Sequence, residues 1–258
     1  MKVAVCVKQV PEAQAKRIDP GTKRLDRSGE GALNAFDANA IEEALRVKES
    51  GGDGEVVLVS LGPESSVDAL RKGLAMGADR AVLVSDDAAG GSDLVATSLA
   101  LAKALERESA DLVLFGQQAG DSDGAVLWAA VAERLALPVV SQAAELSVND
   151  GTARVKRQTE FGYDVIEAPL PAVVAVSDAI NEPRYPSLKG IMGAKKKPQE
   201  SLSLEDLGLE IAQLGDSGSR TEVLALGDPP ARGETVRIEG DGASAEKIVE
   251  FLAQRRVL

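Results

Sequence analysis

Residues 111–126 read Asp111-Leu112-Val113-Leu114-Phe115-Gly116-Gln117-Gln118-Ala119-Gly120-Asp121-Ser122-Asp123-Gly124-Ala125-Val126. The first part, Asp111–Phe115, is almost continuously apolar, which is typical of a parallel strand covered on both faces. The glycines and short polar residues that follow are typical of a turn into a helix. A helical pattern then runs through Ala129 to Leu135 and ends before Pro138. The stretch therefore predicts a strand–loop–helix unit of an α/β protein.

The same order of apolar run and helical pattern recurs earlier in the chain. Further strands are predicted over Lys2–Val7, Glu55–Ser60 and Arg80–Val84. Apolar residues at helical spacing lie between them, over residues 41–48, 66–75 and 93–105. This alternation predicts an α/β fold with a doubly wound, mostly parallel, Rossmann-like sheet.

After Val139 the pattern changes to short strands joined by turns. Strands are predicted over residues 143–148, 152–159 and 163–168, with Asn149-Asp150-Gly151 as a hairpin turn. Pro171-Ala172-Val173-Val174-Ala175-Val176 then predicts another buried strand. We therefore expect a β-hairpin region added to the parallel sheet.

The remaining sequence predicts a loop and a C-terminal arm. Residues 181–198 are rich in Pro, Gly and Lys and show no period, which favours an exposed loop. We predict an α/β domain over residues 1–200, including this loop, and an arm with one amphipathic helix over 201–258. The arm cannot bury much surface by itself. We expect an extended tail that packs on a partner subunit, the alternative being a loose appendage.

Composition excludes several classes of function. The 258 residues hold 29 Lys+Arg and 41 Asp+Glu, a net charge of −12, with no histidine and one cysteine. The acidic balance argues against a broad surface for nucleic acid or anionic membrane. Without histidine there is no Ser-His-Asp triad and no imidazole base, and one cysteine makes no disulfide or Cys-rich metal site. We therefore expect no catalytic residue and no metal site, with demanding chemistry left to a bound cofactor or a partner.

The lengths of the apolar runs also indicate the cellular location of the protein. The opening run, Val3–Val7, is too short for a signal core, and no stretch approaches the roughly 20 apolar residues that cross a bilayer. We expect a cytoplasmic protein, with no targeting peptide and no membrane insertion.

Four loops should meet at one edge of the sheet, because ligands bind beyond the carboxyl ends of strands in open α/β sheets. These loops are residues 7–11, 33–37, 60–63 and 115–126. In the last, glycines allow close backbone approach, and the start of the next helix offers free N–H groups to a phosphate. Neither a P-loop nor a Gly-x-Gly-x-x-Gly turn is present. Two interpretations of these loops therefore stay open, a nucleotide-binding site and ordinary turns.

Three smaller features have competing interpretations. Asp121 and Asp123 suit paired carboxylates, a magnesium site or, preferably, helix caps. Cys6 lies in a predicted strand without cationic neighbours, which predicts a buried, inert thiol. The run Lys195-Lys196-Lys197 follows Leu188, Ile191 and Met192, and with Arg184 and Lys189 it resembles a docking patch of apolar anchors in a basic rim; the alternative is a solvated charge run.

Several motifs then point to one family. The longest is Asn181-Glu182-Pro183-Arg184-Tyr185-Pro186-Ser187-Leu188-Lys189-Gly190-Ile191-Met192-Gly193-Ala194-Lys195-Lys196-Lys197. The stretches at 5–11, 34–36, 40–44, 74–81 and 170–174 are similar to the same family, in the same order. Together they resemble the beta subunit of electron-transfer flavoprotein over nearly the whole chain, most weakly over residues 205–240.

The resemblance implies a docking and structural subunit rather than an enzyme. It implies a heterodimer with an alpha subunit that holds most of one redox-active FAD, and an AMP without redox role in this chain. The AMP contacts would be Cys6, Asn34, Ala35, Phe36, Asp37, Leu61, Gly116, Gln117, Gln118, Ala119, Gly120, Asp121, Ser122, Asp123, Gly124, Ala125, Val126 and Leu127.

The resemblance also implies redox partners. The complex would accept electrons from flavoenzymes of the acyl-CoA dehydrogenase type and pass them to a quinone reductase. The docking contacts would be Arg184, Tyr185, Leu188, Ile191, Met192, Lys195, Lys196 and Lys197, with Leu188 as the anchor.

The sequence departs from the family pattern at two positions, and two alternative functions stay open. Ala13 replaces an aromatic residue that approaches the flavin in several relatives, so this contact is not expected here. Gln158 replaces a Glu that pairs with an arginine of the alpha subunit in better-known members. Because a neutral side chain weakens this pair, we predict a different resting orientation of the flavin domain. In an electron-bifurcating form, a second FAD that oxidises NADH would take the place of AMP. A function of another class is a stand-alone adenine-nucleotide sensor, which would leave the docking segment and the arm without a role.

Overall fold

The apolar runs form the central strands of a single sheet. The computed structural model describes residues 1–12, 17–228, 230–231, 235–238, 240 and 242–257. In this part of the chain, nine strands pair in the order β11-β10-β9-β12-β8-β1-β6-β7-β13. Their bounds are β1 Lys2–Cys6, β6 Glu55–Leu61, β7 Arg80–Val84, β8 Leu112–Gly116, β9 Val139–Asn149, β10 Thr152–Thr159, β11 Gly162–Pro169, β12 Ala172–Val176 and β13 Gln199–Leu202. The sheet is parallel from β9 to β13, as predicted, and only β10 and β11 run antiparallel to their neighbours.

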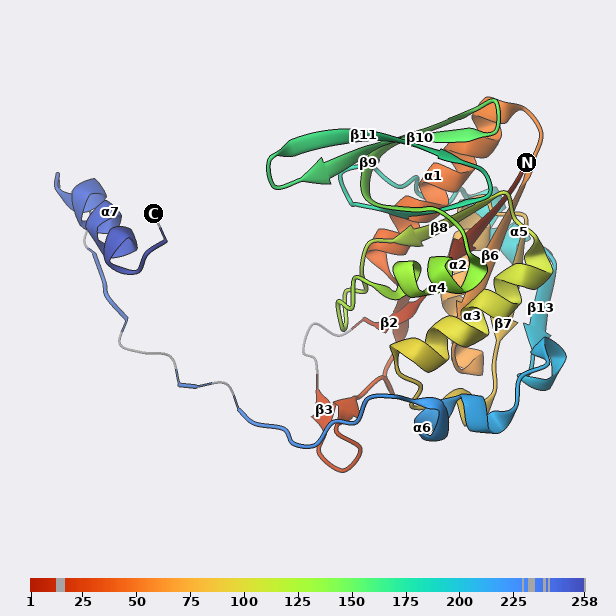
Figure 1. Ribbon diagram of the computed structural model, residues 1–258, viewed down its shortest axis with the longest axis horizontal. Coiled ribbons are helices and arrows are strands. Elements are labelled where there is room, and N and C mark those ends of the chain that lie inside the picture. Colours follow the sequence, from red (N-terminus) through yellow and green to blue (C-terminus); the bar gives the residue numbers. More distant parts are fainter. Residues whose placement is uncertain (13–16, 229, 232–234, 239, 241, 258) are drawn as a thin grey trace. The chain divides into compact units, whose positions relative to one another are not determined.

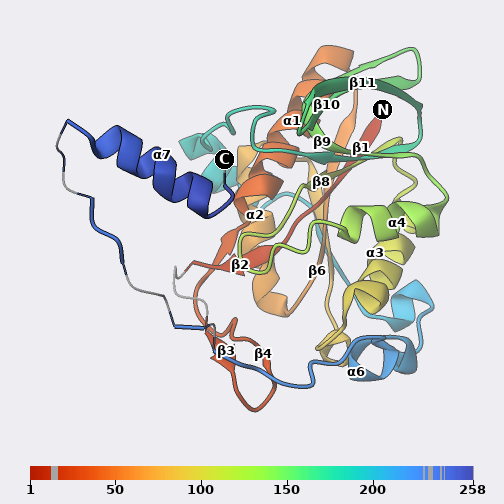
Figure 2. The ribbon, with the colours of Figure 1, turned by 60° about the vertical axis from the view of Figure 1, so that its left-hand side comes forward.

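Helices cover both faces of the sheet (Figures 1 and 2). One face packs against α1 (Ala35–Gly51), α2 (Val67–Met76) and α5 (Leu188–Ala194), and the other against α3 (Leu94–Glu108) and α4 (Leu127–Leu135). Side chains alternate between the faces, so Val3 and Val5 lie in the first core while Ala4 and Cys6 lie in the second. Burial on both faces explains why the strands are continuously apolar.

The order of the strands creates a switch point beside β1. From β1 the chain moves outward to β6 and β7, then returns to place β8 on the other side of β1. The loops that leave β1 and β8 therefore diverge at the carboxyl edge of the sheet, where α/β proteins bind ligands.

Short elements complete the first part of the chain. Between β1 and α1, β2 (Gln9–Pro11) pairs with β5 (Gly31–Leu33), and β3 (Ile18–Asp19) pairs with β4 (Arg24–Leu25). The remaining short helices are η1 Glu64–Ser66, η2 Asp87–Ala89, η3 Glu205–Leu207, η4 Ile211–Gln213 and α6 Gly215–Gly218. The predicted hairpin turn is confirmed, because Asp150 and Gly151 both take the left-handed backbone (φ 47° and 74°) that a tight two-residue turn requires.

The chain divides into two units, residues 1–223 and 224–258. The first unit thus extends beyond the boundary expected at residue 200, because β13 adds a strand to the sheet and four leucines between residues 202 and 214 are buried against the second core. Their irregular spacing in a polar context hides them from pattern analysis. Among its described residues, the second unit contains one helix, α7 (Ser244–Gln254), within the arm for which one amphipathic helix was predicted. Among the described residues, no helix combines the length and apolar character needed to span a membrane.

Candidate functional site

A cavity of about 740 Å³ opens at the carboxyl edge of the sheet. Its walls come from the loops that follow β1, β6, β7 and β8, together with Arg27, Gly31 and the start of α1. The volume lies within the range of small-molecule sites. The predicted meeting place of the strand-end loops is therefore hollow.

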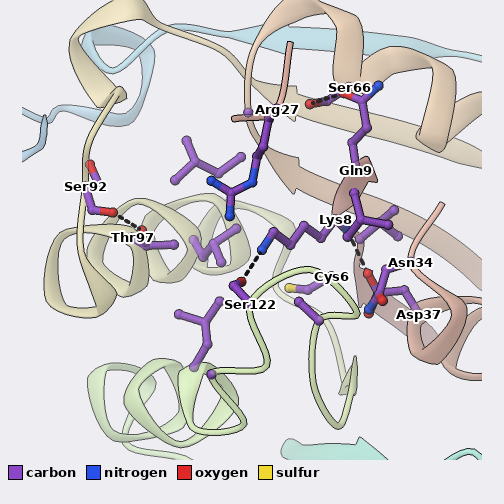
Figure 3. Close-up of a pocket in the computed structure, with 18 of the residues that line it drawn as sticks. Cys6, Lys8, Gln9, Arg27, Asn34, Asp37, Ser66, Ser92, Thr97 and Ser122 are labelled. Carbon is purple, nitrogen blue, oxygen red and sulfur yellow. Dashed lines mark hydrogen bonds between the residues drawn. The ribbon is translucent and has the colours of Figure 1, made fainter. Parts of the chain in front are cut away.

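Two cations point into this space from different segments (Figure 3). Lys8 Nζ lies 2.7 Å from Asp121 Oδ1 and 3.0 Å from Ser122 Oγ, and Arg27 Nε lies 2.8 Å from Asp121 Oδ2. Burial raises the pKa of Asp121, but the hydrogen bonds and charges of Lys8 and Arg27 outweigh it and hold this pKa below its usual value. The cluster of two cations and one carboxylate is itself net positive, and the cavity is also lined by Asp37, Asp86, Asp87, Asp93 and Asp123.

The preferred interpretation of the two aspartates as helix caps is wrong. The N-cap of α4 is Val126, and no side chain accepts a hydrogen bond there. Asp121 serves the ion pairs instead, while Asp123 has left-handed backbone (φ 53°), as do the two residues after it. The first N–H groups of α4 thus stay without side-chain partners, and Leu127 and Trp128 line the cavity.

The start of α1 is tied to the loop that follows β8. Asn34 Nδ2 donates to the Gln118 carbonyl at 2.9 Å, and the Gly120 N–H donates to Asn34 Oδ1 at 3.1 Å. Asp37 accepts from the Lys8 N–H at 2.7 Å. Gly116 passes so close to α1 that a Cβ there would lie 2.4 Å from Asp37 Oδ1 and 2.6 Å from the backbone of Phe36. The cavity wall therefore depends on a glycine at position 116.

Asp37 is a buried acid beside the cavity. Burial raises its pKa from 3.8 to about 7, although hydrogen bonds from Lys8, Asn34 and Gly116 and the charge of Lys8 lower it. The folded chain therefore binds more protons than the unfolded chain between about pH 4 and pH 7, and the contribution of Asp37 to stability is lost as pH rises through this window.

We expect this to be measurable against Asp37→Asn. Between pH 5 and pH 8, the unfolding free energy of the natural chain should fall by about 1–3 kcal/mol relative to that of the variant. Urea unfolding at each pH measures the difference, and other titrating groups cancel in it. A difference that stays constant with pH would show that Asp37 is ionised throughout.

Most predicted nucleotide contacts line the cavity. They are Cys6, Asn34, Asp37, Leu61, Gly116, Gln117, Gln118, Ala119, Ser122, Asp123, Gly124, Ala125, Val126 and Leu127. Ala35, Phe36, Gly120 and Asp121 are not among the lining residues. Ala35 is exposed, and Phe36 is half-buried beside Gly116.

Cys6 is buried as expected, and burial, with the nearby charge of Asp37, raises the pKa of its thiol.

Arg27 and the wall after β7 were not predicted from the sequence. That wall includes Ser92, Asp93 and Thr97. The predicted strand at 80–84 was a usable signal, since its carboxyl end had to reach the same edge of the sheet. Arg27 follows the two-residue strand β4, far in sequence from the end of any predicted strand, and no pattern marks it.

The segment predicted as an exposed loop, residues 181–198, contains the helix α5. Ser187 caps it by accepting from the Gly190 N–H at 3.0 Å. Tyr185, Leu188, Ile191 and Met192 are exposed, as are Lys195 and Lys196. A helix of seven residues with two internal glycines is too short to show a helical period, which explains why the sequence predicts a loop here.

Two predicted docking residues instead make contacts within the chain. Arg184 pairs with Glu42 and Glu49 of α1, and Lys197 donates to backbone carbonyls at the end of α2. Gln158 is exposed on β10 opposite Tyr163, so the altered domain orientation stays a prediction. Ala13 lies outside the described residues.

Comparison with known proteins gives consistent matches. The family model "Electron transfer flavoprotein domain" matches residues 22–207. The chain is 39% identical to the electron transfer flavoprotein subunit beta of Mycobacterium leprae, over 99% of both chains, and 37% identical to that of Megasphaera elsdenii, over 100% of both. It is also 40% identical, over 100% of both chains, to the caffeyl-CoA reductase–Etf complex subunit CarD of Acetobacterium woodii.

Proposed function

The chain belongs to the electron transfer flavoprotein family as a beta subunit, an electron-carrier subunit and not an enzyme, and from this we propose that it holds AMP in the strand-end cavity and docks dehydrogenases through α5. A beta subunit implies an alpha subunit as partner. Similarity to beta subunits over the full length of the chain also argues against the alternative of a stand-alone adenine-nucleotide sensor.

The observation that carries the proposal is the cavity with its cationic cluster. Lys8, Arg27 and the uncapped start of α4 are groups that attract a phosphate. Apolar side chains elsewhere in the walls, including Leu61, Leu101 and Trp128, suit a flat base. The residues present therefore fit an adenine nucleotide.

Flavin chemistry would come from FAD shared with the alpha subunit. When bound, FAD supplies the electron storage that the side chains of this chain do not offer. This chain has no histidine, and its one cysteine is buried. Its own residues would hold the nucleotide, pack on the alpha subunit and present the docking helix.

A second FAD in place of AMP, oxidising NADH, is the second candidate. The cavity favours it in one respect, since its wall extends past the predicted loops to Ser92 and Thr97 and leaves room beyond a mononucleotide. Against it, Lys8 and Arg27 are the only cationic side chains among the described lining residues, and both contact Asp121. One such cluster suits one phosphate, so we place AMP first.

Docking is proposed to use the exposed apolar side chains of α5. Flavoenzymes of the acyl-CoA dehydrogenase type would give electrons to the complex, and a quinone reductase would take them. A single short helix makes a small interface, which suits a transient redox encounter. For the C-terminal arm, residues 224–258, we propose packing on the alpha subunit, since Ile248 and Val249 of α7 are exposed.

The test is purification of this chain together with its alpha subunit, followed by acid release of the bound cofactors. One FAD and one AMP per heterodimer is the expected content. Two FAD and no AMP would select the second candidate.

A further inference from the structure

The docking helix α5 has one side fixed to the protein and one side free. We propose that Arg184, Gly190 and Lys197 are positioning residues, which hold α5 on α1 and α2 so that Leu188 and Met192 face a partner. This inference rests on the proposed docking function. It gives Arg184 and Lys197 a different role from the basic rim expected from the sequence.

Arg184 fixes the entry to α5. Its Nε donates to Glu42 Oε2 at 2.7 Å, its Nη1 donates to Glu49 Oε1 at 2.6 Å, and its backbone N–H donates to Glu42 at 3.2 Å. Glu42 is only 4% exposed, and Arg46 contacts its other oxygen at 2.9 Å. Burial raises the pKa of Glu42, but Arg184 and Arg46 outweigh it and lower this pKa overall, so Glu42 stays ionised near neutral pH.

A second set of hydrogen bonds supports the same entry. Asn39 Nδ2 donates to the Asn181 carbonyl at 2.8 Å, and Asn181 Nδ2 returns a bond to the Asn39 carbonyl at 3.1 Å. Asn181 Nδ2 also donates to Glu43 Oε2 at 3.0 Å. The segment before α5 is therefore joined to α1 through buried polar groups of that helix, which are costly to leave unpaired.

Lys197 fixes the exit from α5. Its Nζ donates to the carbonyl of Leu74 at 2.9 Å and to that of Ala78 at 2.6 Å. A cation is favourable at this place because it lies at the negative end of the α2 helix dipole. Lys197 is thus turned toward the protein, whereas Lys195 and Lys196 are exposed.

Gly190 brings α5 against the last turn of α2. A Cβ at position 190 would lie 2.4 Å from the Ala75 carbonyl oxygen, and Ala194, one turn later, is buried. Leu188 and Met192, also one turn apart, are 81% and 77% exposed. A helix of seven residues is not stable alone, so its orientation depends on these anchors.

The experiment measures KM and kcat for reduction of the heterodimer by an acyl-CoA dehydrogenase, with cofactor content and dithionite reduction of the bound flavin as controls. Gly190→Ala and Arg184→Gln should each raise KM about tenfold and leave the controls unchanged. Gly193→Ala is the matched control on the same helix, because a Cβ there meets nothing within 4 Å, and its KM should not change.

Glu42→Gln separates positioning from direct contact. Since Glu42 is buried beneath the segment, its substitution should raise KM as Arg184→Gln does, and the double variant should be no worse than either single one. A normal KM for Glu42→Gln with a raised KM for Arg184→Gln would overturn positioning and make Arg184 a partner contact. If Leu188→Ala leaves KM unchanged, the docking function itself fails; if Leu188→Ala raises KM but Gly190→Ala does not, only the positioning inference fails.

Discussion

Leu188→Ala is expected to lower the efficiency of electron transfer from a dehydrogenase at least about 30-fold while FAD and AMP content stay unchanged. The side chain is 81% exposed on the free side of α5, so removing it takes little from the fold. An apolar anchor at the centre of a small interface typically contributes about 2 kcal/mol or more, which corresponds to this factor. Steady-state reduction of the heterodimer by an acyl-CoA dehydrogenase measures it.

The control is Ile211→Ala. Ile211 is also apolar and 69% exposed, but it lies on η4 rather than on α5. The buried leucines on either side of η4 belong to the core that α3 and α4 cover, whereas α5 packs on the other core. Its substitution should leave the efficiency within about twofold, the range of ordinary surface changes. Loss of flavin or of the heterodimer in Leu188→Ala would show instead that Leu188 is structural.

Gly116→Ala is expected to remove most of the AMP from the purified heterodimer. The new Cβ would lie 2.4 Å from Asp37 Oδ1 and 2.6 Å from the Phe36 backbone, so the start of α1 and the loop after β8 must move apart. Both segments form the cavity wall. Overpacking of this kind costs about 1–3 kcal/mol, so the variant should still fold.

Gly120→Ala, four residues later in the same loop, is the matched control, because Gly120 does not line the cavity and the variant keeps the N–H that donates to Asn34 Oδ1. A Cβ there would meet only Asn34 Oδ1, at an ordinary contact distance of 3.7 Å. Nucleotide content, measured by chromatography after acid release, should be normal in Gly120→Ala and low in Gly116→Ala. Equal AMP content in the two variants would contradict the assignment of this cavity as the nucleotide site.

The sequence was sufficient to predict the central strands of the sheet but not its edge strand β13, because burial on both faces leaves a direct signal only in the central strands. The apolar runs at 2–7, 55–60 and 80–84 each became a parallel strand within one residue at either end. The turn at Asp150 and Gly151 was predictable for another reason, since few residues accept left-handed backbone. These features depend on local chemistry alone.

Other features depend on contacts distant in sequence. The role of Asp121 is set by Lys8 and Arg27, which lie about a hundred residues earlier, so its local position before a helix was misleading. Likewise, the lysine run reads as one solvated patch, yet Lys197 alone turns inward to the end of α2. The candidate cavity was predictable as a set of strand-end loops, but its charge cluster was not.

The most direct test of the central claim is the cofactor content of the complex that this chain forms. Co-expressed with its alpha subunit and purified through a tag on this chain, it should give a yellow heterodimer that releases one FAD and one AMP. A colourless homodimer, or a heterodimer with FAD but no adenine nucleotide attributable to this chain, would contradict the account.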